Sequence, residues 1–212
     1  MNPLVTCLCL TRSRREWLPK AIACFLVQTY EPKELLIVAD GPSDVWGLIP
    51  DAKNIRVAYA SGMVGFKRNW GCWEARGELI AVWDDDDWSA SGRLTAQVKA
   101  IQRTGLAVTG FRDLKFTDGR QWWQWLGWDN FAIATSLMFQ KDWWADHRFR
   151  EVQSGQDEAF ATQAFQLGQL AVEPDRNLMY ATIHPGNTSP RNPNGPQWKE
   201  LPEFEWSDGE AA

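Results

Sequence analysis

The sequence predicts an α/β fold with a mostly parallel, Rossmann-like central sheet flanked by helices. Short apolar runs alternate with segments of helical periodicity through the first half, and polar turns join them. Such alternation with short connections favours parallel strands covered by helices on both faces. The alternation is less strict in the second half, which predicts a small mixed region beside the sheet.

The first half contains four expected strands and three expected helices. The strands cover residues 4–10, 34–39, 55–58 and 78–82, and the helices cover 17–26, 67–76 and 94–104. Glycine at the end of a helical pattern is typical of the C′ position, so Gly77 and Gly105 are expected to end the second and third helices. Thr11, Asp40 and the acidic run at 84–87 all follow strands, and ligands of parallel sheets bind beyond those strand ends.

The second half predicts a hairpin turn, two strands and one helix. The turn covers 116–119, the strands 133–139 and 178–183, and the helix 156–167 with Gly168 after it. The tail beyond Pro190 is rich in proline, asparagine and tryptophan and is expected to be irregular.

The composition is that of an ordinary globular protein. The 212 residues carry a net charge of −5, with 44% hydrophobic and 23% charged residues, which gives no general attraction to nucleic acid. No apolar stretch approaches the ~18 residues of a membrane span and no signal-peptide pattern is present, so a cytoplasmic location is expected. The four cysteines form no C-x-x-C pair, which favours reduced, buried thiols.

The most informative segment is the acidic run Asp84-Asp85-Asp86-Asp87, which lies between Trp83 and Trp88. Four adjacent carboxylates repel one another, and a cation held at the end of a buried strand would stabilise them. Such hard oxygen ligands suit Mg²⁺ or Mn²⁺. The run alone also fits a solvated acidic turn.

Fourteen tryptophans are a strong excess, and four of them cluster between Trp122 and Trp128. Their spacing does not fit one buried stripe, so some of these rings are expected to be exposed or to line a cleft. Tryptophan presents a rigid apolar face that stacks on sugars or bases.

Five short segments follow one another in a specific order. They are the strand at 4–11, the turn Gln28-Thr29-Tyr30, the strand end at 36–41, the stretch at 67–71 and the acidic strand end at 77–87. In order and spacing they resemble family 2 glycosyltransferases, over roughly residues 4–190. The resemblance implies a GT-A fold, a nucleotide-sugar donor, a divalent cation and inversion at the anomeric carbon.

The resemblance also assigns donor-side residues. Thr11, with Arg12 and Arg14 beside it, matches the site that holds the nucleotide, and Asp40 matches a carboxylate that accepts a uracil N–H. Arg68 matches a basic residue facing the base or phosphates. The Asp-x-Asp pair is Asp84 and Asp86, with Asp86 as the metal contact and Asp85 near the ribose, while Asp87 either supports the site or caps the next helix. Arg12 departs from the family, which commonly has an aromatic there, and Ala39 replaces a frequent acid.

On the acceptor side, Asp157 matches the general base, although Gln156 replaces the first acid of the usual pair. Glu158 is expected near the acceptor, with Trp122, Trp125 and Trp128 as a wall beside it. Asp157 and Glu158 also suit a helix N-terminus without any catalytic role. His184 matches a loop histidine that contacts the metal or the diphosphate.

These features predict a metal-dependent inverting glycosyltransferase domain over 1–190, with a nucleotide-sugar half at 1–105 and an acceptor half at 106–190. The donor is expected to be a UDP-sugar, and the acceptor a hydroxyl of a glycan, protein, lipid-linked sugar or modified nucleobase in DNA. The alternatives are a metal-dependent nucleotidyltransferase and a nucleotide-sugar or carbohydrate-binding module without turnover. A nucleotidyltransferase is expected to have a glycine-rich phosphate loop after the first strand, and this sequence has no glycine there.

Overall fold

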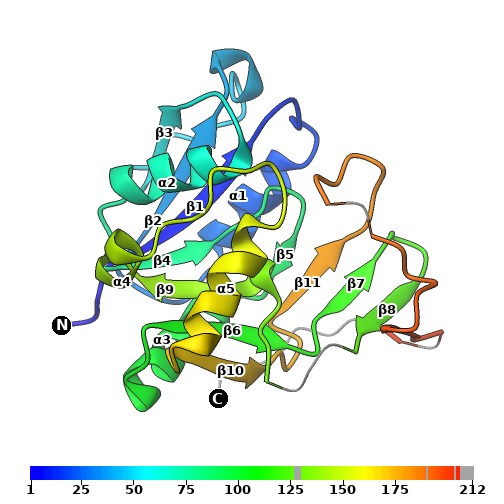
Figure 1. Ribbon diagram of the computed structural model, residues 1–212. Helices are drawn as coiled ribbons and strands as arrows, with labels where there is room; N and C mark the ends of the chain where they lie inside the picture. The colour runs from blue at the N-terminus through cyan, green and yellow to red at the C-terminus, as the bar shows by residue number, and fades with distance from the viewer. Residues whose placement is uncertain (127–129, 190, 203, 206–212) are drawn as a thin grey trace.

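The computed structural model describes residues 1–126, 130–189, 191–202 and 204–205, and its ribbon is drawn in Figure 1. Within these residues, seven strands form the central sheet in the order β10-β6-β9-β4-β1-β2-β3. Only β9 runs antiparallel to its neighbours β4 and β6. The strands are β1 (Val5–Thr11), β2 (Lys33–Ala39), β3 (Ile55–Tyr59), β4 (Leu79–Val82), β6 (Val108–Arg112), β9 (Met138–Gln140) and β10 (Leu170–Pro174).

Helices cover both faces of this sheet because its strands bury side chains on both sides. The helices are α1 (Leu18–Leu26), α2 (Val64–Glu74), α3 (Arg93–Thr104), α4 (Lys141–Asp146) and α5 (Gln156–Gln166). On one face, Cys7 and Ile37 pack with α1 and α3. On the other face, Leu8 and Val38 pack with α2, α4 and α5. Successive residues of one strand thus enter opposite cores, as the period of a β-strand requires.

A second sheet lies beside the first, at the right of Figure 1. Its order within the described residues is β12-β8-β7-β11-β5. These strands are β5 (Trp88–Ser89), β7 (Lys115–Thr117), β8 (Trp122–Trp125), β11 (Met179–Thr182) and β12 (Trp198–Glu200). Its own apolar cluster includes Phe111, Phe116 and Met179. The strand β5 begins directly after the acidic run, so the run connects the two sheets.

Most expected elements are confirmed. The strands β1 to β4, the helices α1, α3 and α5, the β7–β8 hairpin and β11 lie where the sequence predicts them, within a few residues. Gly105 follows α3 with a φ of 68°, and Gly168 follows α5 with a φ of 66°, the left-handed conformation that glycine adopts without strain.

Gly77 is different, and the prediction that it ends the second helix is wrong. The helix α2 covers Val64–Glu74 rather than 67–76, and Gly77 is not left-handed. A Cβ atom on Gly77 would lie 2.6 Å from the backbone nitrogen of Thr6, so the residue is needed for close approach to β1. Its N–H donates to Thr6 Oγ1 at 2.9 Å.

Two other expectations also differ from the structure. The predicted strand at 133–139 is shortened to β9, because a 3₁₀ turn, η2 (Ala134–Ser136), occupies its first part. The tail expected to be irregular contributes β12, which pairs antiparallel with β8. Pairing between segments so far apart in sequence leaves no local signal in either of them.

All four cysteines are free and buried, as expected. Among the described residues, no helix combines the length and the apolar character needed to cross a bilayer.

Candidate active site

A cleft of about 320 Å³ opens where β1 and β4 end. Adjacent parallel strands β4, β1 and β2 end at the same edge of the sheet, so Thr11, Asp40 and the acidic run come together there, as the sequence predicts. The start of α2, the start of α5 and the end of β11 form the other walls. The site therefore draws residues from both sheets.

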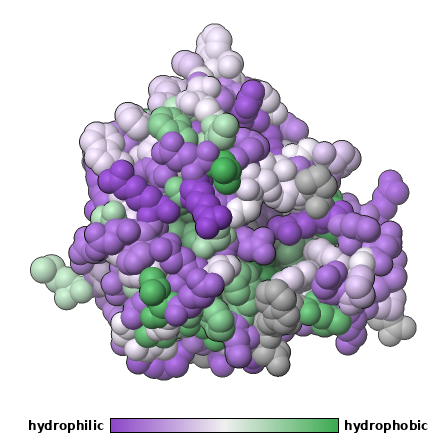
Figure 2. All heavy atoms as spheres, in the orientation of Figure 1, coloured by the Kyte–Doolittle hydropathy of each residue, from purple (hydrophilic) through white to green (hydrophobic). Residues whose placement is uncertain are grey.

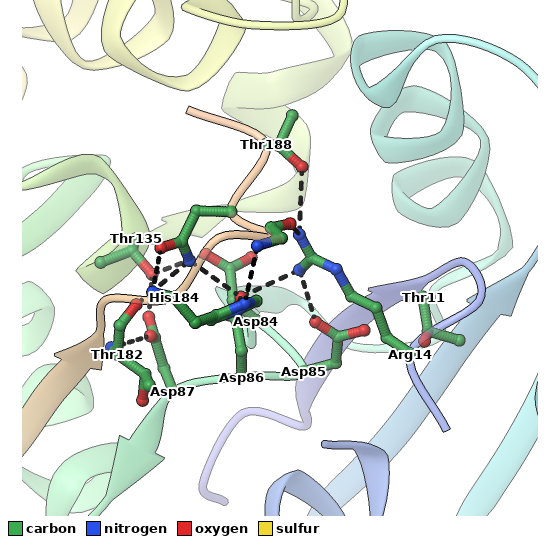
Figure 3. Close-up of polar contacts among 12 residues, drawn as sticks. Thr11, Arg14, Asp84, Asp85, Asp86, Asp87, Thr135, Thr182, His184 and Thr188 are labelled. Carbon is green, nitrogen blue, oxygen red and sulfur yellow. Dashed lines mark hydrogen bonds and ion pairs between the residues drawn. The ribbon is translucent and has the colours of Figure 1, made fainter. Parts of the chain in front are cut away.

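Three residues of the acidic run are buried and Asp84 is half-buried, which excludes the solvated-turn interpretation. Asp85, Asp86 and Asp87 are each at most 8% exposed, and all four carboxylates line the cleft. Figure 3 shows these carboxylates with their partners, which include Thr135 and Arg14. Because buried carboxylates need compensating donors or cations, each partner is informative.

Asp84 and Asp87 share one hydroxyl. Thr135 Oγ1 lies 2.6 Å from Asp84 Oδ2 and 2.6 Å from Asp87 Oδ2 (Figure 3). Asp84 also faces Arg68 Nη2 at 3.7 Å, and Asp87 accepts the backbone N–H of Thr182 at 3.0 Å. Asp87 therefore joins β4 to β11. The alternative that it caps the next helix is wrong, since α3 begins after Gly92.

Asp86 contacts the loop that follows β11. Its Oδ2 lies 2.9 Å from His184 Nε2 and 3.3 Å from Asn187 Nδ2 (Figure 3). The imidazole stacks on Trp17, with ring centroids 4.5 Å apart. Asn187 Oδ1 accepts the backbone N–H of His184 at 2.7 Å, which fixes the turn of the loop. The structure thus brings together Asp86 and His184, both of which are expected at the metal or the diphosphate.

Arg14 ties the acidic run to this loop. Its Nη1 donates to Asp85 Oδ1 at 3.0 Å and to Asp86 Oδ2 at 2.9 Å. Its Nη2 donates to the carbonyl of Gly186 and contacts Thr188 Oγ1 at 3.5 Å. A guanidinium in this position contacts two carboxylates and a loop from the far end of the sequence (Figure 3).

Burial changes the acidity of the run. Burial, reinforced by the charge of Asp86 and opposed by Arg14, raises the pKa of Asp85 to about 7. Burial also raises the pKa of Asp84, with Arg68 opposing, and raises that of Asp87 well above its ordinary value. These oxygens thus have a high affinity for positive charge, whether from protons or from cations.

Asp40 does not itself line the cleft; it lies beside the lining residues Arg12 and Lys67 and is surrounded by these cations. It forms a close ion pair with Lys67 Nζ, and Arg12 Nε lies 3.6 Å away. Lys67 also donates to the carbonyl of Thr11 at 2.9 Å and so joins the ends of β1 and β2. Asp44 Oδ2 accepts the Asp40 backbone N–H at 3.2 Å.

The two acids that open α5 have different positions. Asp157 lines the cleft, whereas Glu158 is exposed and is not among the lining residues. The charge of Asp157 acts on Asp84, where it contributes to the raised pKa. Gln156 is buried and lines the cleft as well.

Trp122 and Trp125, two of the three tryptophans expected as a wall, lie outside the cleft. Trp122 packs edge-on against Tyr180 and Phe204, with centroids 5.1 and 5.2 Å apart. Trp125 packs on the apolar cluster of the second sheet. Neither residue lines the cleft, and Trp128 lies outside the described residues. The wall beside the acidic run is formed instead by Phe116, Thr182 and the loop at 186–189.

Several buried polar atoms of the cleft have no hydrogen-bond partner within the described chain. They are Thr11 Oγ1, Arg68 Nε and Nη1, Asp85 Oδ2, Gln156 Oε1 and Thr182 Oγ1. Buried groups of this kind are rare in folded proteins and are expected where a ligand binds. Five cationic side chains line the same cleft: Arg12, Arg14, Lys67, Arg68 and Arg191. Donors and cations facing buried carboxylates suit a ligand that is itself anionic.

Metal-binding capacity is confined to part of the run. Across the described ranges, no three carboxylate, imidazole or thiolate groups converge as a complete metal centre. Asp86 with His184, next to the unpartnered Asp85 Oδ2, offers a partial donor set. Mg²⁺ is commonly bound by one or two carboxylates together with substrate phosphates, so a partial set fits such an ion.

The sequence does not predict the roles that Thr135, Asn187 and Lys67 have in the site. Thr135 lies in the turn η2 where an unbroken strand was expected. Asn187 is in the same loop as His184, so the polar character of that loop was the only available signal. Lys67 was recognised only as part of a motif.

Comparison with known proteins identifies the family and the fold. The family model for glycosyl transferase family 2 matches residues 8–162. Staphylococcus aureus TarS 1-349 in complex with UDP-GlcNAc has a TM-score of 0.70 at 18% identity, covering 87% of this chain and 60% of TarS 1-349. The mannosyltransferase PcManGT from Pyrobaculum calidifontis, in complex with GDP-Man and Mn²⁺, has a TM-score of 0.67 at 15% identity, covering 82% of this chain and 56% of PcManGT. A search of curated proteins finds no match.

The structural likeness is that of the GT-A fold, and this chain spans little more than half the length of these two enzymes. The family model extends from within β1 into α5 and so includes the strand ends, the acidic run and the opening of α5. This match covers well over half of the chain. The protein belongs to glycosyltransferase family 2.

Proposed function

We propose that this protein transfers a sugar from a UDP-sugar to an acceptor hydroxyl, with inversion at the anomeric carbon. One observation carries the proposal: the acidic run faces unpartnered buried donors and cations across a single cleft. A nucleoside diphosphate matches this site because its phosphates accept from cations while its base and ribose require specific polar partners. The solved relatives are described with UDP-GlcNAc or with GDP-Man.

The nucleotide is proposed to lie over the ends of β1 and β2. Thr11 and Arg12 line that end of the cleft, and Asp40 lies next to them as the ion-pair partner of Arg12 and Lys67. The Asp40 carboxylate accepts the uracil N–H, and Lys67 holds this carboxylate in place through its ion pair. Arg68, with two unpartnered nitrogen atoms, donates to the phosphates. Asp85, which accepts a hydrogen bond from Arg14, is proposed to contact the ribose.

A divalent cation, Mn²⁺ or Mg²⁺, fits the other side of the run. Asp86 and His184 supply the partial donor set that would hold it, and Asp84, the other acid of the expected pair, is proposed to join them when the ion binds. The buried Asp85 Oδ2 without a partner supports an additional positive charge there. When bound, such an ion acts as a Lewis acid on the leaving diphosphate. Asn187 and Trp17 keep His184 oriented toward Asp86.

Asp157 is proposed as the general base. It lines the cleft at the first turn of α5 and lies near enough to Asp84 to affect its pKa. From there the carboxylate removes the proton of the acceptor hydroxyl as the oxygen attacks the anomeric carbon and the bond to the diphosphate breaks. The displacement proceeds in one step and inverts the configuration.

Calorimetry with UDP tests the donor side. Wild type is expected to bind UDP more tightly with Mn²⁺ than without it, and Asp86→Ala is expected to lose this dependence. Asp51→Ala is the matched control, since Asp51 is an exposed carboxylate outside the cleft. Unchanged metal-dependent affinity in Asp86→Ala would contradict the assignment of the metal site.

Turnover separates an enzyme from a binding module. Wild type is incubated with Mn²⁺ and UDP-sugars, and UDP release is measured with and without candidate acceptors. Acceptor-dependent release supports transfer. Tight binding of UDP-sugars without release in any combination would favour a non-catalytic sugar-nucleotide module, and preference for GDP-sugars would overturn the choice of base.

A further inference from the structure

The helix α2 has two different faces. Lys67 and Arg68 are buried and line the cleft, whereas Phe66, Trp70 and Trp73 are exposed at 37%, 37% and 63%. Their spacing of four and three residues places these rings on one side of the helix. We call these three residues the aromatic stripe. In Figure 2, pale and green spheres interrupt the purple surface where Figure 1 draws α2.

The rings of the stripe form a continuous row. Phe66 and Trp70 stack with centroids 6.5 Å apart and an interplanar angle of 28°. Trp70 and Trp73 follow at 5.5 Å and 43°. Large aromatic side chains in such a row are uncommon on an otherwise polar surface, and contiguous exposed apolar groups indicate a binding surface.

The stripe begins at the edge of the catalytic cleft. Gly62 lines the cleft, and a Cβ atom placed on it would lie 3.4 Å from the ring of Phe66. The N–H of Gly65 donates to the carbonyl of Val152 at 3.0 Å, and the neighbouring Gln153 lines the cleft near Asp157. A ligand that leaves the cleft at this edge therefore meets Phe66 first and then the tryptophans.

The chemistry of the stripe favours carbohydrate over an anionic membrane. Sugar rings present apolar C–H faces that stack on aromatic side chains, and a row of rings contacts successive units of a chain. An anionic bilayer would attract basic residues around the aromatic side chains, but the protein carries a net charge of −5. Continuity with a cleft that handles sugars points in the same direction.

We propose that the aromatic stripe is a binding site for an extended glycan, the acceptor or product chain of the reaction in the cleft. This inference rests on the proposed function, because it identifies the acceptor as a polymeric carbohydrate. The stripe holds the chain on α2 while its terminal sugar reaches Asp157. It contributes to binding of long acceptors and leaves the donor site unchanged.

The test is native gel electrophoresis in gels containing soluble glucan, mannan or glycol chitin. Wild type is expected to be retarded by at least one of these polymers. The double variant Trp70→Ala/Trp73→Ala is expected to bind that polymer at least about threefold to tenfold more weakly, the range implied by one or two lost stacking contacts. Trp46→Ala is the matched control, because Trp46 is 82% exposed in the loop between β2 and β3.

Calorimetry with UDP and Mn²⁺ separates this inference from the proposed function, since the double variant should bind UDP as wild type does. No retardation of wild type, equal retardation of wild type and double variant, or an equal loss in Trp46→Ala would overturn the glycan site while leaving donor binding intact. Sedimentation with phosphatidylcholine and phosphatidylglycerol vesicles that depends on Trp70 and Trp73 would overturn it in favour of a lipid surface.

Discussion

Replacing Thr135 with valine removes the hydroxyl that Asp84 and Asp87 share. The hydroxyl lies 2.6 Å from an oxygen of each carboxylate. Asp87 keeps the backbone N–H of Thr182, whereas the contact left to Asp84 among the described residues is the longer ion pair with Arg68 at 3.7 Å. Asp84 is therefore the residue that valine disturbs most.

Two consequences can be estimated. A hydrogen bond to a charged group contributes about 1.5–3 kcal/mol, so Thr135→Val is expected to lower the free energy of unfolding by about 2 kcal/mol. Groups that orient metal ligands typically change metal affinity by about 10-fold to 100-fold when they are removed. Because Asp84 belongs to the proposed metal pair, we expect Mn²⁺-dependent UDP affinity to fall within that range.

Urea denaturation and calorimetry measure the two effects separately. Thr135→Ser is the matched control, since it keeps the hydroxyl and loses only the methyl group, and it should bind UDP with Mn²⁺ as wild type does. If Thr135→Val binds as tightly as wild type, the hydroxyl does not orient Asp84 for a metal. If Thr135→Ser loses as much affinity as Thr135→Val, packing of the methyl group explains the effect instead.

Three further predictions address other parts of the molecule. Asp40→Ala should weaken UDP by ~1–3 kcal/mol and GDP by less, measured by calorimetry, because only uracil loses its matched acceptor; equal losses would mean that Asp40 only shapes the pocket. Asp157→Asn should reduce sugar transfer by roughly 10²-fold or more with little change in donor affinity, whereas Glu158→Gln, at the exposed neighbouring residue, should keep most activity. Normal transfer by Asp157→Asn would contradict its assignment as the general base. Burial raises the pKa of Asp175 to about 6, so the folded state holds this proton more tightly than the unfolded state does. As the pH rises from about 4 to about 6, the free energy of unfolding should therefore fall by about 3 kcal/mol more in wild type than in Asp175→Asn, and parallel urea stabilities of the two proteins would contradict this.

The half of the site on β1, β2 and β4 could be predicted because each of its residues belongs to a pattern within a short segment of the sequence. Each strand is a short apolar run and the functional residue follows its end, so parallel pairing alone brings Thr11, Asp40 and Asp84 to one edge. The order β4-β1-β2 then makes them neighbours. Neither step depends on a contact between distant side chains.

The other half depends on contacts that leave no local pattern. Thr135 reaches Asp84 only because the expected strand breaks into a 3₁₀ turn. Trp122 is expected at the cleft because the spacing of the tryptophan cluster does not fit one buried stripe, but the pairing of β8 with β7 turns it toward Tyr180 and Phe204. Tertiary pairing decided both outcomes, and strand propensity alone is a weak guide to it.

The acidic run contributes to the fold as well as to the site, because its contacts join the two sheets. Asp85 and Asp86 accept from Arg14 after β1, Asp86 also meets the loop after β11, and Asp87 accepts from Thr182 in the second sheet. Four carboxylates face Arg14 and Arg68 as their ion-pair cations, together with one imidazole, within the described chain. Burial raises the pKa of Asp84, Asp85 and Asp87, and the charge of the neighbouring carboxylates raises it further. Fewer cations than carboxylates thus leave an excess of negative charge in a buried place. The same excess makes a bound divalent cation favourable, so the arrangement that joins the two sheets also supplies the electrostatic reason for metal-assisted release of a diphosphate.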